Sequence, residues 1–359
     1  MRSKFFITDE GFGPIVRQSA IIEELVKLEP SLEITLQLDR FYKEAQHIIP
    51  GINYRRQFNN IIWHKNEDGT PDFHSIRKYY SGYQEISNQY LKEEPSLASC
   101  DFIVSDFVYE AFEAARRDGI PSYGVSHFTW DWFFSKMYPP PIPGDVIRMM
   151  MERASMARIL FFPPFTPREI TEHYREKVVE VPLIVRKHRA NHLELQNKKP
   201  NILMMDSGSR LNRLAMEQIV AQLTELDSYH FYLPGHYDAE ADNITTLPEN
   251  DLLVDYIGKM DLVVSRAGFN TITECIAYRT PMLLFGEILN AEMRENTHFV
   301  KEQGLGSFTS LEVLKNQPEK VLGDLFDGEY PVLKRNMDDH DIRVDGARVV
   351  AEKILDDIH

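Results

Sequence analysis

The chain has 359 residues, 43% of them hydrophobic and 26% charged, which is the balance of a globular protein long enough to form two cores. Its formal net charge of −15 argues against nucleic acid as a partner, because a phosphate backbone is bound by clustered cations. No apolar run approaches the roughly 20 residues of a membrane span, and the first residues lack the pattern of a signal peptide, so we expect a cytoplasmic protein.

Short apolar runs alternate with helix-period segments in the first half of the chain, a pattern typical of a parallel α/β sheet. A proline- and aromatic-rich insert at 128–165 is expected to form loops around a cleft. Its aromatic side chains support two hypotheses, packing in the core or cleft and peripheral contact with a lipid acceptor at a membrane. The expected strands are 4–8, 33–38, 101–105 and 122–125, and the expected helices are 15–28, 75–91 and 107–118.

The same alternation resumes after a polar, apolar-poor linker at 186–200. We therefore predict two Rossmann-like domains, 1–185 and 186–359, with a last helix that could cross back to the first domain. The two cysteines, Cys100 and Cys275, lie far from each other and from any metal-ligand spacing, so we expect reduced thiols and no metal site. The expected elements of the second domain are strands 202–205, 229–233, 261–265 and 282–285 and a helix at 211–226.

The first candidate site is the glycine turn that follows the first strand. Gly11 and Gly13 suit a tight turn, which many doubly wound sheets have for structural reasons alone. Asp9 and Glu10 precede them, and either carboxylate could act as a general base if this turn faces a substrate.

The strongest local signal is the segment 261–281, a buried strand followed by SRAG and a helix expected to start near Thr271. Such a turn leaves backbone N–H groups free to bind an anion, and Gly268 lets a ligand approach the backbone. Arg266 and Asn270 flank that glycine, and Glu274 could accept hydrogen bonds from ribose hydroxyls. The segment TITE at 271–274 is equally well explained as a capping box that needs no ligand.

A second turn of small residues, Ser207, Gly208 and Ser209, lies between an expected strand and an expected helix. Its hydroxyls and N–H groups could donate to a pyrophosphate, although an ordinary strand–helix turn has the same composition. Its interest comes from the pairing, since two phosphate-suited turns in one sheet match a nucleoside diphosphate.

Four segments resemble the GT-B glycosyltransferases related to the N-acetylglucosaminyltransferase that makes lipid II, and more closely the glycosyltransferase-like N-terminal region of L-arabinokinases. Residues 11–17 (GFGPIVR) are similar to the family's GFGHxxR loop. Residues 105–131 are similar to its SD…A…GIP…NFSWD stretch, 181–186 (VPLIVR) to its VPLVVR segment, and 267–274 (AGFNTITE) to its xGYGTxSE helix start.

The resemblance implies a GT-B fold, with two Rossmann-like domains facing each other across a cleft and the nucleotide-sugar, most simply a UDP-sugar, on the C-terminal domain. It places the diphosphate on the two small-residue turns, the ribose on Glu274 and the nucleobase near Tyr256. A small-molecule, glycan or lipid-linked acceptor would bind the N-terminal domain, and helix termini would take the place of a metal cofactor. Besides Glu10 and Asp9, His127 and Asp131 are candidates for the general base that deprotonates the acceptor hydroxyl.

This sequence differs from the family at three positions that carry chemistry. Pro14 stands where the family has a histidine, and Glu10 replaces a second histidine of the arabinokinase-type loop. The lipid II enzyme has a donor-contacting glutamine three residues before an asparagine, and here that spacing from Asn296 gives Met293. Glycosyl transfer is the leading hypothesis. Nucleotide-sugar hydrolysis or epimerisation, and a non-catalytic nucleotide-sugar-binding protein, remain open alternatives.

Overall fold

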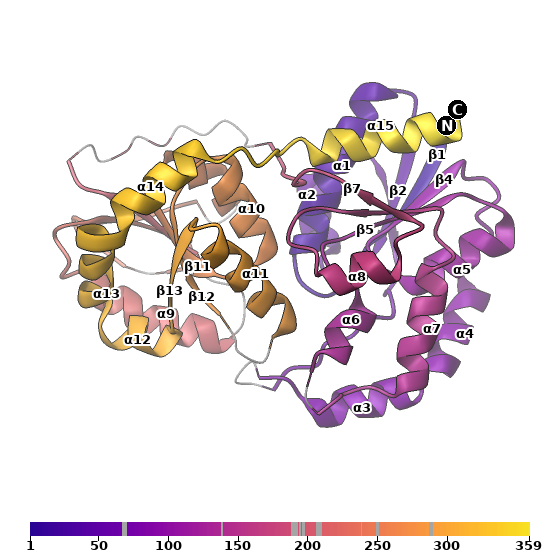
Figure 1. The fold of residues 1–359 in the computed structure, drawn as a ribbon, viewed down its shortest axis with the longest axis horizontal. Helices are drawn as coiled ribbons and strands as arrows, with labels where there is room; N and C mark the ends of the chain where they lie inside the picture. The colour runs from indigo at the N-terminus through magenta and orange to yellow at the C-terminus, as the bar shows by residue number, and fades with distance from the viewer. Residues whose placement is uncertain are drawn as a thin grey trace. The chain divides into compact units, whose positions relative to one another are not determined.

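The computed structural model describes residues 1–66, 70–137, 139–187, 193, 195, 198–205, 210–237, 239–248, 251–286 and 290–359, with backbone alone for 210–214. The chain forms two compact units (Figure 1). Unit 1 comprises Met1–His64, Pro71–Arg186 and Arg343–His359, and unit 2 comprises Lys65–Thr70 and Lys187–Ile342. The boundary between the units therefore follows Arg186, and the end of the chain belongs to unit 1.

Unit 1 is built on a seven-stranded sheet in which every pairing is parallel. Its order is β3-β2-β1-β4-β5-β6-β7, so the direction of winding reverses between β1 and β4. In such sheets ligands bind outside the carboxyl ends of the strands at this switch point. The strands are β1 Arg2–Phe6, β2 Glu33–Leu38, β3 Asn53–Arg56, β4 Phe102–Ser105, β5 Ser122–Val125, β6 Ile159–Phe162 and β7 Val178–Glu180.

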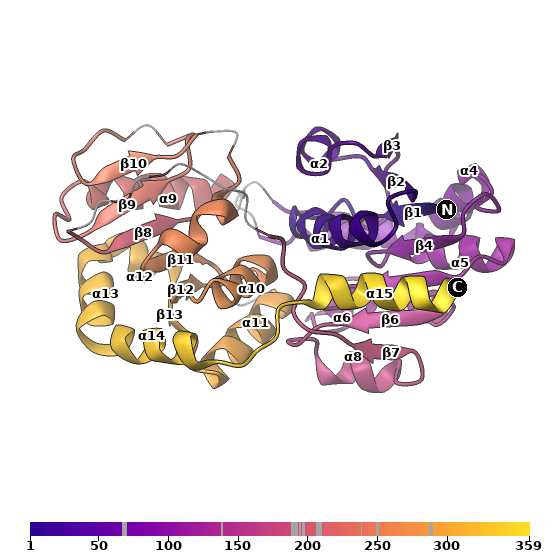
Figure 2. The ribbon, with the colours of Figure 1, turned by 90° about the horizontal axis from the view of Figure 1, so that it is seen from above.

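Helices of unit 1 lie beside this sheet, and the last helix of the chain packs along α1 (Figure 2). Leu183 and Arg343 pair through their backbones, as do Leu183 and Gly346, which fixes the start of that last helix. The helices are α1 Gly13–Leu28, α2 Tyr42–Ile48, α3 Phe73–Ser81, α4 Tyr83–Glu93, α5 Tyr109–Asp118, α6 Trp130–Ser135, α7 Gly144–Ala154, α8 Arg168–His173 and α15 Gly346–Ile358.

Unit 2 repeats this plan with a six-stranded parallel sheet of order β10-β9-β8-β11-β12-β13. Its switch point lies between β8 and β11. The strands are β8 Asn201–Met204, β9 His230–Leu233, β10 Ile244–Thr246, β11 Leu262–Arg266, β12 Met282–Phe285 and β13 Gly306–Thr309. The helices are α9 Arg210–Leu223, α10 Phe269–Ala277, α11 Ala291–Glu302, α12 Leu311–Asn316, α13 Pro318–Asp324 and α14 Tyr330–Asp339, with a 3₁₀ segment at Leu253–Lys259 and a π-helical turn at Leu325–Glu329.

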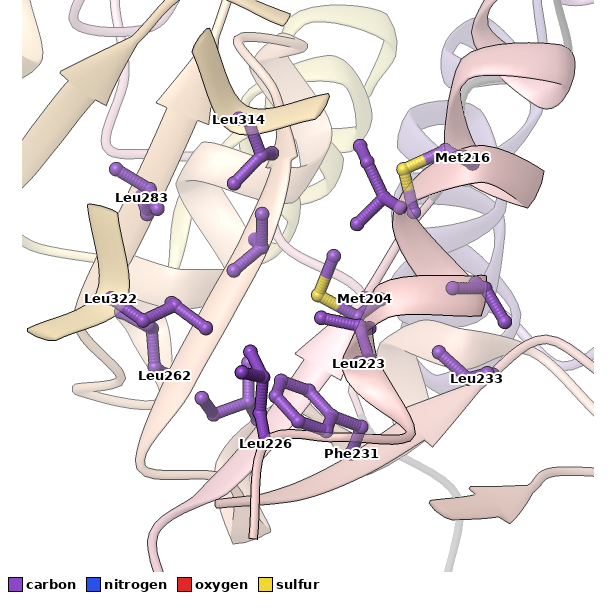
Figure 3. Packing of buried hydrophobic residues seen from close by; sticks show 14 of the residues in the cluster. Met204, Met216, Leu223, Leu226, Phe231, Leu233, Leu262, Leu283, Leu314 and Leu322 are labelled. Carbon is purple, nitrogen blue, oxygen red and sulfur yellow. The ribbon is translucent and has the colours of Figure 1, made fainter. Parts of the chain in front are cut away.

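The core of unit 2 follows directly from the period of two along its strands. Alternate residues of four neighbouring strands point to one face, among them Met204, Phe231, Leu262 and Leu283 (Figure 3). Apolar residues of α9, α12 and α13 cover that face, including Met216, Leu223, Leu314 and Leu322. Unit 2 thus has a hydrophobic core of its own.

Several expected elements differ from the observed ones. The expected helix at 75–91 is two helices, α3 and α4, because the backbone leaves helical geometry at Gly82. The expected helix at 107–118 starts two residues later, since Phe107 adopts a positive φ of 51°. The insert at 128–165 contains α6, α7 and β6 rather than loops alone.

The aromatic side chains of the insert are mostly buried inside unit 1. Trp130, Trp132, Phe133 and Phe134 are 8%, 6%, 2% and 0% exposed, and Trp63 packs on the last two. The hypothesis of peripheral membrane contact through these rings was wrong, because they form part of the core. Arg186, expected in a polar linker, is likewise buried.

Candidate functional site

The switch point of unit 2 brings the ends of β8 and β11 side by side, since the two strands pair in parallel from Leu262 with Ile202 to Val264 with Met204. Ser207, Gly208 and Ser209, which follow β8 in the sequence and were predicted to form a phosphate-binding turn, lie outside the described residues. The turn after β11 is described and leads into α10. Parallel neighbours end at the same sheet edge, so the chain leaves β8 beside the turn after β11.

The helix after β11 begins at Phe269, with Gly268 as its N-cap and no side-chain hydrogen bond to the cap. The expected capping box at 271–274 was therefore wrong, because Thr271 already lies inside the helix, where it cannot act as the N-cap. Asn270 and Thr271 lie in the first turn and are half-buried. A Cβ added to Gly268 would meet no atom within 4 Å, so the Cβ position of this glycine is open among the described residues.

A buried cation and a buried amide flank this turn. Arg266 closes β11, is 9% exposed, and its Nη2 lies 3.2 Å from the sulfur of Met293. A thioether sulfur is a weak acceptor for a guanidinium. Asn296 of α11 donates from Nδ2 to the carbonyl of Ala267 at 3.0 Å, which holds the turn against α11. Sequence reasoning named Arg266 but gave Asn296 no part in holding the turn.

Two further predicted residues of unit 2 lie apart from the turn along the chain. Glu274 is in the second turn of α10 and is 1% exposed. Tyr256 lies in the 3₁₀ segment that packs against α10, and its hydroxyl donates to Asp251. Burial and the neighbouring Asp251 raise the pKa of Tyr256, so its ring is a neutral phenol at physiological pH.

In unit 1, Asp9 is a buried structural carboxylate. It is 1% exposed and accepts the backbone N–H groups of Asp39 and Arg40 at 2.8 Å each and that of Asn59 at 2.9 Å. Burial raises the pKa of Asp9, and these three hydrogen bonds oppose that shift. Its oxygens join the ends of β1, β2 and β3.

Glu10 follows, with a side chain that is 11% exposed, and forms an ion pair with Arg40, Oε1 to Nη1 at 2.8 Å. Gly11 follows with a φ of 81°, a left-handed conformation that favours glycine. Gly13 is the first residue of α1 and Pro14 the second, a position where the missing N–H of proline costs nothing. The substitution of the family histidine by proline is thus compatible with the helix start.

His127 belongs to a buried cluster at the ends of β4 and β5. Arg17 of α1 holds Asp106 through both carboxylate oxygens and donates to Nδ1 of His127 at 3.2 Å. Ser126 and Gln18 complete the cluster. The sequence analysis quoted Arg17 and Asp106 only for their resemblance and assigned them no role. The sequence contained a signal for this ion pair. Arg17 lies in the motif after β1 and Asp106 in the motif after β4, and these two strands are neighbours.

Asp131 is not joined to that cluster. It lies in α6, is 5% exposed, and receives the hydroxyl of Tyr109 at 2.5 Å and that of Tyr174 at 3.5 Å. Burial raises the pKa of Asp131, and the hydrogen bond from Tyr109 opposes the shift. The four candidates for the general base therefore lie in three environments. Asp9 and Glu10 are in the loop after β1, His127 is in the buried cluster, and Asp131 is in α6.

Neither a metal cluster nor a membrane helix is found in the part of the chain that the structure describes. No group of three or more His, Cys, Asp or Glu residues there could hold a metal ion. None of the described helices combines the length and the apolar character needed to cross a bilayer. Both cysteines are free thiols, Cys275 buried and Cys100 half-buried.

Solved structures of similar architecture define the fold class. The glycotransferase of kitacinnamycin aligns with a TM-score of 0.67 at 14% identity, covering 99% of this chain and 98% of that one. MurG of Acinetobacter baumannii gives 0.59 at 16% identity over 99% of both chains. Medicago truncatula UGT71G1, solved with UDP-glucose, gives 0.63 at 15% identity over 99% and 98%. The chain has the GT-B fold, as predicted.

Sequence comparison indicates a class of activity within this fold. Residues 192–341 match the profile of the glycosyltransferase family 28 C-terminal domain. The chain is 24% identical over 322 residues to an uncharacterized glycosyltransferase of Methanosarcina mazei, covering 78% of each. It is 22% identical over 296 residues to L-arabinokinase of Arabidopsis thaliana, covering 78% of this chain but only 27% of that protein. Together, the matched domain and the fold support glycosyl transfer as the class of activity.

Proposed function

We propose that this protein transfers a sugar from a nucleoside-diphosphate sugar to the hydroxyl group of an acceptor. Unit 2 would bind the nucleotide and unit 1 the acceptor. The observation that carries the proposal is the switch point of unit 2, where α10 begins after Gly268, a glycine whose Cβ position meets no atom, directly after the buried guanidinium of Arg266. The match of this unit to a glycosyltransferase C-terminal domain and the likeness to a fold solved with UDP-glucose support it.

The diphosphate would lie at the first turn of α10 and on the turn at 207–209. Positive helix ends favour anions, and backbone N–H groups of this first turn would bind phosphate oxygens. Arg266, whose Nη2 lies 3.2 Å from the sulfur of Met293, would donate charge-assisted hydrogen bonds to the diphosphate. Leaving-group charge is then stabilised without a metal cofactor. Glu274 would accept hydrogen bonds from the ribose hydroxyls, and the nucleobase would lie near Tyr256.

The acceptor hydroxyl needs a proton acceptor, because Pro14 has no acid–base chemistry. Glu10 is the best candidate, since Asp9 is committed to three backbone N–H groups and Asp131 to two tyrosines. Glu10 would exchange its ion pair with Arg40 for a hydrogen bond to the acceptor.

Nucleotide binding can be measured before any acceptor is known. We expect UDP at about 100 times its dissociation constant to add about 2.7 kcal/mol to the unfolding free energy. Hydrogen exchange with and without UDP should show added protection at 262–274 in unit 2. ADP, GDP and TDP in the same assay would identify the preferred nucleobase. Protection confined to residues 1–180 would contradict the proposal.

Transfer itself is tested by Glu10→Gln once a donor is turned over. We expect the turnover number to fall about a hundredfold or more with donor affinity unchanged, because the base is lost and the nucleotide site is not. Glu44→Gln, a change of a carboxylate in α2 of the same unit, is the matched control. Turnover like the wild type in Glu10→Gln would remove the base from this loop.

The alternative with structural support is a non-catalytic nucleotide-sugar-binding protein. Each of the carboxylates proposed as a base already has a hydrogen-bonded or ionic partner. Tight UDP binding without turnover across a panel of acceptors would favour it. Release of free sugar without an acceptor would instead favour a hydrolase.

A further inference from the structure

The turn between β11 and α10 in unit 2 is closed by hydrogen bonds of its own backbone. Ala267 is fully buried, and its N–H donates at 2.9 Å to the carbonyl of Phe285, the last residue of β12. The N–H of Gly268 donates to the carbonyl of Arg266 at 2.8 Å. The pairing of β11 with β12 thus continues into the turn and gives it a defined backbone conformation.

The carbonyl of Ala267 is held by a side chain instead. Asn296, in the second turn of α11, is 1% exposed and donates from Nδ2 to this carbonyl at 3.0 Å. A carbonyl only accepts hydrogen bonds, so the NH₂ end of the carboxamide is the end that lies here. With its N–H on β12 and its carbonyl on α11, Ala267 is fixed at both of its polar backbone groups.

This hydrogen bond bears on where α10 begins. Gly268 is extended, with φ −79° and ψ 136°, and its carbonyl accepts the first bond of the helix, from the N–H of Ile272 at 3.1 Å. In a helix that began one residue earlier, the carbonyl of Ala267 would accept the N–H of Thr271. Glycine has no Cβ to oppose that change. The hydrogen bond from Asn296 does oppose it, because it keeps the carbonyl directed at α11.

The N–H of Thr271 is the group that this arrangement leaves outside the helical ladder. Thr271 is half-buried in the first turn of α10, and no hydrogen bond from its N–H is found within the described part of the chain. The Cβ position of Gly268, at the start of the same turn, meets no atom within 4 Å.

We propose that Asn296 is a positioning residue for the nucleoside diphosphate. By holding the carbonyl of Ala267 it keeps the N–H of Thr271 available to a phosphate oxygen. Asn296 acts through the backbone of the turn rather than by touching a phosphate itself. This role rests on the proposed function, in which the diphosphate binds at the first turn of α10.

Asn296→Ala in the full chain tests the role through nucleotide affinity, measured by NMR titration. We expect the dissociation constant for UDP to rise about tenfold or more, because the phosphate loses a hydrogen bond once the N–H of Thr271 pairs with Ala267. The dissociation constant for uridine, which has no phosphate, should stay within about twofold. Wild-type UDP affinity in folded Asn296→Ala would overturn the proposal.

Asn243→Ala is the matched control. Asn243 also belongs to unit 2, is 1% exposed, and donates from Nδ2 to the carbonyls of Leu223 and Leu226 at 2.8 and 3.1 Å. Its loss should lower stability as Asn296→Ala does and leave UDP affinity within about twofold of the wild type. An equal loss of UDP affinity in Asn243→Ala would mean that lower stability weakens binding, and the role of Asn296 would be overturned.

Amide exchange of the wild type decides the matter even if Asn296→Ala does not fold. Without nucleotide, the amides of Ala267 and Ile272 should be protected, and the amide of Thr271 should exchange readily until UDP is added. A Thr271 amide that is protected before UDP is added would overturn the proposal. Wild-type protein that binds none of UDP, ADP, GDP and TDP would contradict the proposed function and this role together. UDP binding that survives Asn296→Ala contradicts this role alone.

Discussion

Buried carboxylates account for much of the polar interior of unit 1, and their partners differ in kind. Asp9 binds backbone N–H groups, Asp106 binds a guanidinium, and Asp131 binds two phenols. Glu110 is fully buried and receives the hydroxyls of Tyr83 and Ser87. The partner affects what each carboxylate can do, since hydrogen bonds donated to a carboxylate favour its charged form and oppose the effect of burial on its pKa.

Asp131→Asn tests the effect of burial on a carboxylate. Because the pKa of Asp131 is raised above its usual 3.8, the folded state binds a proton more tightly than the unfolded state. This group's contribution to stability is complete below the usual pKa and is lost as pH rises through the folded value. The unfolding free energy of the wild type minus that of Asp131→Asn should therefore fall across this acid window and then level off.

Urea unfolding between pH 3.5 and 7 measures that difference. Asp145→Asn, an exposed change at the start of α7, serves as the control and should show no comparable slope. A difference that rises with pH would mean that the hydrogen bonds from tyrosine outweigh burial.

Glu274→Gln tests the assignment of Glu274 to the nucleotide. Loss of a charge-assisted hydrogen bond to ribose should cost on the order of 1 kcal/mol or more, about fivefold in dissociation constant. Titration calorimetry with UDP measures this, and thermal unfolding without ligand shows the effect on the fold. Glu295→Gln on the exposed side of α11 is the matched control. Lower stability with unchanged affinity would assign Glu274 a structural role alone.

At the scale of elements, two glycines that each begin a helix have opposite surroundings. Gly268 precedes α10 and would place a Cβ in open space, with an ordinary φ of −79°. Gly346 begins α15, where a Cβ would lie 2.0 Å from the carbonyl oxygen of Pro182. Close packing requires glycine at the second site, whereas nothing in the described residues requires it at the first. We propose that Gly268 gives a ligand access to the backbone.

Alanine at each position separates the two roles. Gly268→Ala should change the unfolding free energy by less than about 1 kcal/mol, because cap and unfolded-state effects oppose each other. It should weaken UDP binding at least tenfold, since the methyl group blocks the helix terminus. Gly346→Ala should cost about 1–3 kcal/mol through overpacking and leave UDP affinity intact. Urea unfolding and calorimetry measure both, and unchanged UDP affinity in Gly268→Ala would remove the anion site.

At the scale of the whole molecule, each unit has its own sheet and its own switch point, and the chain ends on the unit in which it began. Helix α15 buries Ala347, Val350, Ala351 and Ile354. Asp357 accepts the hydroxyl of Tyr123 at 2.6 Å and pairs with Arg158, so the last turn is held to the starts of β5 and β6. Unit 1 is thus completed by residues remote in sequence.

Ending the chain at Ile342 should therefore destabilise unit 1 selectively. Loss of the buried face of α15 should cost on the order of 5 kcal/mol by the usual value for apolar burial. Hydrogen exchange should lose protection in β1, β4 and β5 while β8, β11 and β12 keep theirs, because the core of unit 2 has no residue from α15. Equal loss in both units would show that they fold as one.

The sequence by itself determined the two parallel sheets, the strands 33–38, 122–125 and 282–285 to the residue, and the glycine turns at the strand ends. Local periodicity and turn chemistry suffice for these. Tertiary structure decided what local patterns do not contain. The hydrogen bonds of Asp9 and Asp131, and those of Arg17 with Asp106 and His127, join groups that lie 22 to 110 residues apart. The start of α10 at Phe269 rather than near Thr271 depends on backbone geometry. A motif names residue types, but only packing across the sheet decides which of them meet.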